Sequence, residues 1–111
     1  MLPLLNGLRA TSLHIAVLLS AALVTAHAQA NEALANKSSC LGCHAVAIKL
    51  VGPAFKDVAA KYAGQADAQT MLMQSIRNGS VGKWGELPMP ANPKISDADL
   101  KKLATWVLTA K

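Results

Sequence analysis

Two cysteines and one histidine lie within five consecutive residues, Cys40-Leu41-Gly42-Cys43-His44, and the chain has no other cysteine. A C-x-x-C-H motif is typical of the covalent attachment of a c-type haem. On a helical turn, residues spaced i, i+3 and i+4 share one face, so two thioether bonds and an imidazole beneath the iron can form together. We therefore predict Cys40 and Cys43 as covalent anchors of the haem and His44 as an axial ligand of its iron.

Two other kinds of site use the same residue types. A redox-active pair of cysteines belongs at a helix N-terminus in a βαβ setting, and the sequence has no strand pattern that would build one. A structural zinc site needs four ligands, mostly cysteine and histidine, whereas residues 31–111 contain three. Both alternatives stay open, and haem attachment is strongly favoured over them.

A second candidate ligand is Met89, in an irregular segment at 79–93 that contains three glycines and three prolines. A loop of this length inside a small domain is uncommon and usually functional. Pro90 biases Met89 toward an extended backbone, and Pro88 stiffens the loop before it. Methionine with histidine is a standard axial pair of haem iron and raises its reduction potential. We predict Met89 as the axial ligand opposite His44; a methionine that only packs in the loop is the alternative.

Trp84 lies in the same segment. A buried indole N–H needs a hydrogen-bond acceptor, and a haem propionate is one candidate. An exposed or simply packed tryptophan fits the sequence equally well.

Four stretches of the chain have helical patterns: one from Glu32 through Lys37 toward the cysteines, with Asn31 as its candidate cap, and others at 54–63, at 68–78 and from Ser96 toward the C-terminus. The apolar residues of the second recur at i, i+3, i+4 and i+7, and those of the last form one stripe. We expect Asp67 to cap the third helix, and Ser96, with Asp99 at the capping-box position, to cap the last. The sequence therefore predicts an all-α fold of four to five short helices around one covalently bound haem.

The first 30 residues have the features of a secretory signal peptide. Arg9 gives a weakly basic start, an apolar run at 13–24 follows, and small residues precede cleavage positions after Ala28 and Ala30. The apolar run is shorter than the ~20 residues of a membrane span, although an uncleaved anchor is an alternative. We favour cleavage after Ala30. This predicts a signal peptide at 1–30, a domain at 31–111 and export to the periplasm, with no integral membrane association of the mature chain.

The charge of the predicted domain is mildly positive. Residues 31–111 contain 10 basic and 6 acidic residues, which leaves +4. Without a basic cluster, this excess argues against nucleic acid as a partner. It fits steering toward an acidic patch on a protein, although lysines that only solvate helix faces would look the same.

Five segments together resemble the small class I bacterial cytochromes c of the cytochrome c-551 type. They are C-L-G-C-H, V-G-P-A-F-K-D-V-A-A-K-Y-A-G-Q-A, R-N-G-S-V-G-K-W-G, L-P-M-P and L-A-T-W-V-L, and they span most of 31–111. The resemblance implies the class I cytochrome c fold, one haem c on Cys40 and Cys43, and axial ligation by His44 and Met89. It also implies the Pro53 carbonyl as acceptor for the His44 ring, Trp84 as a donor to a propionate, and packing of the first helix against the last near Trp106.

The chain departs from this pattern at two positions. Ser75 stands where relatives carry an arginine close to the propionates, and Arg77 is a candidate replacement. Ala35 stands where relatives often have a phenylalanine, so the contact between the terminal helices is expected to be less filled.

An iron with both axial positions occupied has no open site for a substrate. We therefore predict an electron-transfer protein, not an enzyme. On family analogy it shuttles between respiratory complexes, for example from a bc1-type donor to a nitrite reductase or a terminal oxidase. It is expected to be a monomer that docks on redox proteins with acidic patches. If Met89 does not bind the iron, a haem peroxidase or a sensor of small gases is the alternative.

Overall fold

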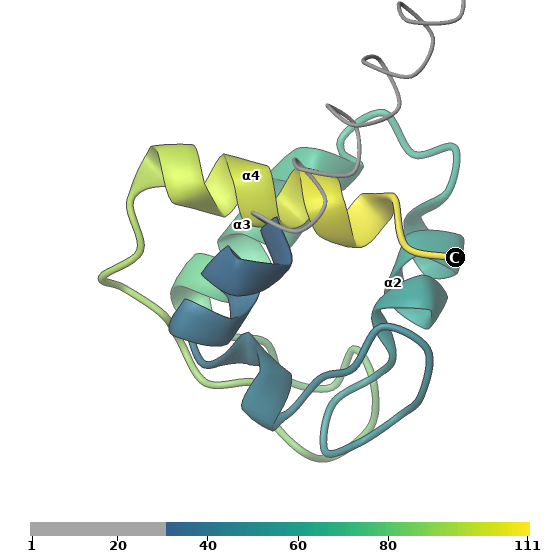
Figure 1. Cartoon of the computed structure of the whole chain (residues 1–111). Helices are drawn as coiled ribbons and strands as arrows, with labels where there is room; N and C mark the ends of the chain where they lie inside the picture. The colour runs from purple at the N-terminus through teal and green to yellow at the C-terminus, as the bar shows by residue number, and fades with distance from the viewer. Residues whose placement is uncertain (1–30) are drawn as a thin grey trace, which may run out of the picture. The chain divides into compact units, whose positions relative to one another are not determined.

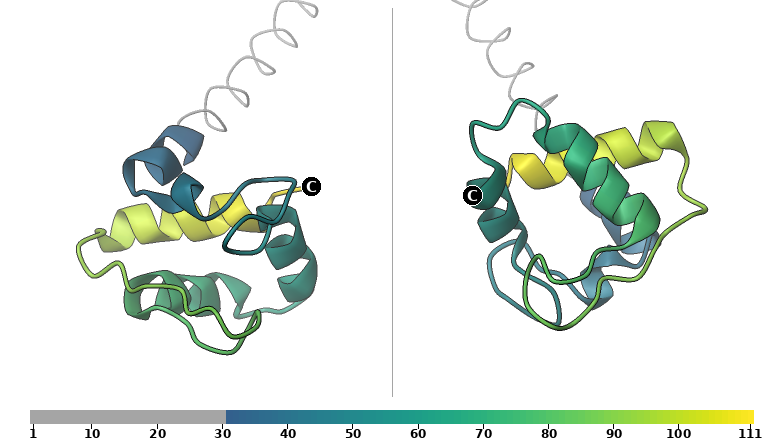
Figure 2. Two further views of the ribbon diagram at one scale, coloured as in Figure 1. Left: turned by 90° about the horizontal axis from the view of Figure 1, so that it is seen from below. Right: turned by 180° about the vertical axis from the view of Figure 1, so that it is seen from behind.

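Helix α4, Asp97–Leu108, is the element against which the other helices of the domain pack. The computed structural model describes residues 31–111, so the predicted signal peptide lies outside the described residues. Both α2 (Phe55–Tyr62) and α3 (Ala68–Asn78) contact α4, and residues 31–37, which are helical, lie against it as well (Figures 1 and 2). A short 3₁₀ helix, η1 (Cys40–Gly42), completes the order of elements. The described residues contain no strand beyond one isolated bridge, so the all-α prediction is confirmed.

The helices follow their apolar residues closely. The predicted face of α2 is buried. Of the five residues in the predicted stripe of α4, Leu100, Leu103, Ala104 and Val107 are buried and Leu108 is half-buried. Together with Ala68 and Leu72 of α3, the side chains of α2 and α4 form the core. Burial of such side chains is the main source of stability in a domain of this size. The first helix contributes Ala35, which is completely buried.

The predicted caps have different outcomes. The Ser96 side chain accepts a hydrogen bond from the backbone N–H of Asp99, 3.2 Å away, and so caps α4 as expected. Asp67 takes the N-cap position of α3 as expected, but its side chain accepts no capping hydrogen bond. Instead, the first N–H group of α3, that of Ala68, donates a hydrogen bond to the Gln65 carbonyl of the preceding turn, at 3.3 Å.

Two long loops connect these helices, and both run away from α4. One covers residues 43–54, between η1 and α2, and the other covers residues 79–96, between α3 and α4. The view from below shows them on opposite sides of the region between the helices (Figure 2, left). The first loop carries His44 and the second carries Met89, the two predicted ligands. Within residues 31–111, no helix is both long enough and apolar enough to cross a membrane.

Candidate functional site

A cavity of about 760 Å³ lies between the helices and the two loops. All six site residues predicted from the sequence line it: Cys40, Cys43, His44, Pro53, Trp84 and Met89. Much of the remaining wall is apolar and comes from all four helices, with Ala35, Phe55, Leu72 and Leu103 among its residues. Its volume falls within the range of about 300–1,000 Å³ that is typical of cofactor sites. A large apolar cofactor held by a few polar groups suits such a cavity.

His44 is fixed from two sides. Its Nδ1 lies 2.8 Å from the Pro53 carbonyl oxygen. Since a carbonyl only accepts, Nδ1 carries the proton in this contact, which in a neutral imidazole leaves the lone pair of Nε2 free. The ring also stacks on Phe55 at a centroid distance of 5.0 Å, and Phe55 meets Trp106 of α4 edge-on at 5.4 Å. A histidine oriented in this way is a prepared metal ligand, because the hydrogen bond sets its tautomer and raises its basicity.

The loop after His44 is held by its own backbone. The Gly52 N–H donates to the Cys43 carbonyl at 2.7 Å, and the Phe55 N–H donates to the Ala45 carbonyl at 2.9 Å. These bonds return the chain past the imidazole and bring Pro53 to Nδ1. Gly52 passes so close to the ring that a side chain there would collide with it. This close contact between Gly52 and His44 was not predicted from the sequence.

The two cysteines and the histidine lie on one turn, as the sequence predicts. The Cys43 N–H and the His44 N–H both donate to the Cys40 carbonyl, at 3.2 and 2.9 Å. The two thiols are free rather than joined in a disulfide. Burial, opposed in part by a backbone hydrogen bond, raises the pKa of the Cys40 thiol. Thiol redox enzymes need a lowered thiol pKa, so this environment does not favour thiol chemistry.

Met89 is held through its backbone. The Met89 N–H donates to the Ser80 carbonyl at 2.8 Å, and the Ser80 N–H donates back to the Met89 carbonyl at 3.0 Å. Gly79 precedes this bridge with φ +78°, and a Cβ on it would lie 2.6 Å from the Met89 oxygen. Glycine is therefore needed here both for its positive φ and for the close approach of the backbone. The pairing uses only the backbone of Met89, and the residue lines the cavity.

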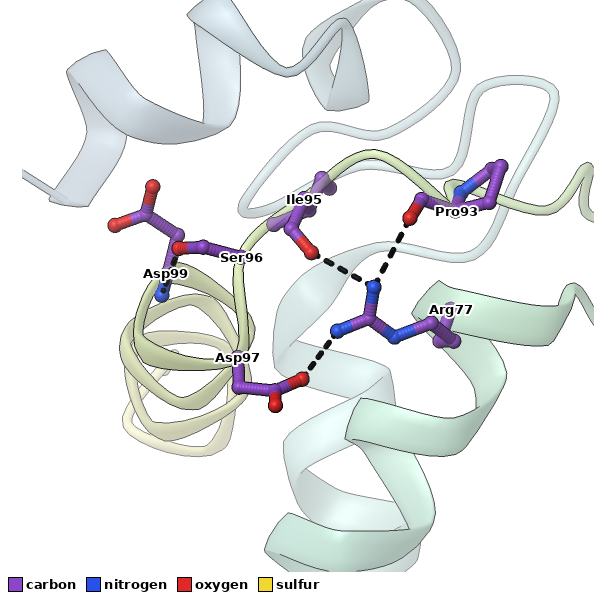
Figure 3. Close-up of polar contacts among 6 residues, drawn as sticks. All are labelled: Arg77, Pro93, Ile95, Ser96, Asp97 and Asp99. Carbon is purple, nitrogen blue, oxygen red and sulfur yellow. Dashed lines mark hydrogen bonds and ion pairs between the residues drawn. The ribbon is translucent and has the colours of Figure 1, made fainter.

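Asn92 and Arg77 fasten the same loop to α3. The Asn92 N–H donates to the Ile76 carbonyl at 3.0 Å, and its side-chain amide donates to the carbonyls of Ile76 and Pro90, both at 3.3 Å. The Arg77 guanidinium donates to the carbonyls of Pro93, at 3.1 Å, and Ile95, at 2.8 Å, and pairs with the Asp97 carboxylate (Figure 3). Neither clamp was predicted from the sequence.

These contacts give Arg77 a role different from the one considered in the sequence analysis. Its guanidinium is engaged by the segment before α4, and Arg77 does not line the cavity. These contacts therefore do not support Arg77 as a replacement for the arginine that is absent at Ser75. Ser75 does line the cavity, and its hydroxyl lies 3.0 Å from the amine of Lys83.

Trp84 lies beside the cavity with 39% of its surface exposed. The Lys61 amine lies 4.5 Å from the centroid of its ring and donates to the Lys83 carbonyl at 3.0 Å. This contact connects the Trp84 segment to α2. The predicted role of Trp84 as a donor to a propionate stays a prediction.

Comparison with known proteins places this geometry in a family. The model of the family described as Cytochrome c matches residues 28–111. The chain is 55% identical to cytochrome c-552 of Nitrosomonas europaea over 92 residues, covering 83% of this chain and 89% of that protein. It is 52% identical to cytochrome c-551 of Pseudomonas aeruginosa over 86 residues, covering 78% of this chain and 82% of that protein. The crystal structure of wild-type cytochrome c552 from Nitrosomonas europaea matches with a TM-score of 0.70 at 55% identity, covering 72% of this chain and 99% of that one.

Proposed function

This chain belongs to the cytochrome c family, and we propose that it is a soluble periplasmic carrier of single electrons with histidine and methionine as axial ligands. The family implies one covalently bound haem c, and its c-551 and c-552 members are electron-transfer proteins rather than enzymes. The observation that carries the proposal is the placement of His44 and Met89, from two different loops, on the wall of one largely apolar cavity.

The residues present fit this cofactor. Cys40 and Cys43 offer two free thiols on the turn that ends at His44, which suits thioether attachment. His44 Nε2 and the Met89 thioether are the proposed axial ligands. The bound haem supplies a one-electron ferric–ferrous couple, and the family resemblance makes Trp84 a proposed donor to its propionates.

The protein fixes the orientation of these groups and limits their contact with water. The Pro53 carbonyl and the Phe55 ring fix the imidazole, and the Ser80 bridge with the Arg77 and Asn92 contacts fixes the loop of Met89. With the His44 ring and the Met89 backbone held by these contacts, little rearrangement is needed when the charge changes by one. The apolar side chains that line the cavity limit the access of water to a bound haem, and burial together with axial ligand identity sets the reduction potential.

Location and partners follow from the same proposal. We propose cleavage of residues 1–30 as a signal peptide after Ala30, with Ala28 as the alternative, and export of a domain at 31–111. The small-residue sites in the sequence and the family's match to residues 28–111 support this division. Respiratory complexes, such as a bc1-type donor and a nitrite reductase or terminal oxidase as acceptor, are the proposed redox partners of this monomer.

Binding of carbon monoxide distinguishes an electron carrier from the alternative function, a peroxidase or a gas sensor. Because Met89 occupies the remaining axial position, we expect the reduced holoprotein to bind no carbon monoxide at neutral pH within minutes. Optical spectra before and after addition of the gas measure this. Prompt formation of a carbon monoxide complex would sink the carrier proposal and support an open-iron function.

Docking through lysines predicts a dependence on ionic strength. The domain carries a net charge of +4, and Lys49 and Lys83 lie on the cavity wall. Electron transfer to an acidic redox protein is therefore expected to slow by about tenfold or more as ionic strength rises from 0.01 to 0.5 M, because screening shortens the reach of charge steering. Stopped-flow kinetics at several salt concentrations measure the rate. A rate that does not change with salt rules out steering by these charges.

A further inference from the structure

We infer that Lys83, positioned by Ser75, is the residue of this chain that neutralises a haem propionate and thereby raises the reduction potential. The inference rests on the proposed function, since it requires haem in the cavity. It assigns a residue that neither the motif analysis nor the family resemblance identified.

Lys83 is held at the cavity by contacts of both its side-chain amine and its backbone carbonyl. Its amine donates to the Ser75 hydroxyl at 3.0 Å, and its carbonyl accepts from the Lys61 amine at 3.0 Å. Ser75 belongs to α3 and Lys61 to α2, so the contacts join the residue to two helices. Both Lys83 and Ser75 line the cavity. The side chain is therefore directed along the cavity wall by a hydrogen bond.

Few basic residues in the described part of the chain could neutralise a propionate in the cavity. Among residues 31–111, the basic residues that line the cavity are Lys49 and Lys83. Lys49 belongs to the loop that carries His44, whereas Lys83 lies beside Trp84. Arg77 is engaged by Asp97 and two carbonyls away from the cavity. Lys83 forms none of the ion pairs found within residues 31–111, so its charge is available to an anion in the cavity.

The propionate carboxylates of a haem need a positive charge of this kind nearby. A haem carries two carboxylates on one edge, and a carboxylate that enters an apolar cavity is costly unless it is paired and hydrogen-bonded. An ammonium with a neighbouring hydroxyl offers both a charge and a second hydrogen-bonding group. A positive charge near the iron also opposes the extra positive charge of the ferric state. Lys83 should therefore stabilise the reduced form relative to the oxidised form.

The test is the equilibrium midpoint potential of the holoprotein in matched variants. We expect Lys83→Gln to shift the redox equilibrium about threefold toward the oxidised form, a fall of ~28 mV at ~59 mV per tenfold change. Lys101→Gln removes the same charge from an exposed position of α4 that does not line the cavity, and it should shift the equilibrium by less than a third of that amount. Lys83→Arg keeps the charge and should restore most of the potential.

The role of Ser75 is tested separately. Ser75→Ala removes the hydroxyl that holds the amine, so we expect a smaller shift in the same direction as Lys83→Gln. A wild-type potential in this variant would show that Ser75 does not position Lys83. Equal shifts for Lys83→Gln and Lys101→Gln would overturn the whole inference, because only a general surface charge would then be at work.

Failure of this inference is distinguishable from failure of the proposed function. If Lys83 has no special effect, the reduced wild-type protein still resists carbon monoxide. If the carrier proposal fails, carbon monoxide binds whatever residue stands at 83.

Discussion

Met89→Ala is expected to lower the midpoint potential of the holoprotein by on the order of 0.1 V or more, within the range of about 0.8 V that axial ligands span. A thioether favours ferrous iron, and alanine offers no replacement donor. The reduced variant should also bind carbon monoxide promptly, unlike the wild type. Because the Ser80 bridge uses only the backbone of residue 89, the loop should keep its structure.

Met73→Ala is the matched control for this variant. Met73 lies on α3, packs against the core and does not line the cavity. Met73→Ala removes one thioether from the domain, as Met89→Ala does. It should lower the stability of the domain while leaving the midpoint potential and the carbon monoxide response close to wild type. If Met89→Ala keeps the wild-type potential, or if Met73→Ala is the variant that loses it, the assignment of the axial ligand is wrong.

Gly52→Ala is expected to displace His44. A Cβ at position 52 would lie 2.8 Å from Nδ1 and 2.9 Å from Nε2 of the imidazole, and it would also collide with Cε1. The ring cannot yield easily, since Phe55 stacks on one face and the Pro53 carbonyl holds Nδ1. We expect the free energy of unfolding to fall by about 1–3 kcal/mol, the usual cost of overpacking, together with a changed midpoint potential.

Gly42→Ala provides the comparison. Position 42 lies inside the cysteine motif, yet a Cβ there meets no atom within 4 Å. Denaturant unfolding and redox titration of the two holoprotein variants should therefore differ clearly, with Gly42→Ala close to wild type. Equal stability and equal potential in the two variants would contradict the proposed fit between Gly52 and the histidine.

Much of the fold could be predicted because its signals are local. The bounds of α3 agree with the expected 68–78, and α2 is one residue shorter at each end than the expected 54–63. The Ser96 cap depends on residues three apart, and apolar spacing identifies the buried faces of α2 and α4. The motif at 40–44 and the proline-flanked Met89 similarly point to the cavity, where the structure brings them together.

The unpredicted contacts depend on how the chain folds back on itself, over separations of 8 to 18 residues. Arg77 reaches carbonyls 16 and 18 residues away, and its spacing on α3 gives no sign of this. In the sequence, Gly79 indicates the end of a helix. Its close approach to the Met89 carbonyl follows only from the Ser80 bridge. The contact between Ser75 and Lys83 requires α3 and the next loop to fold over the cavity. Asp67 takes the N-cap position that the local signal predicts, but its side chain does not form the capping hydrogen bond.

The central claim is that the loop of Met89 closes over the iron opposite His44. The most direct measurement is the far-red absorption of the ferric holoprotein, where charge transfer from a methionine sulfur to ferric iron gives a weak band. We expect this band in the wild type and in Met73→Ala, and its complete loss in Met89→Ala. A wild-type protein without the band, or a Met89→Ala protein that keeps it, would contradict the claim.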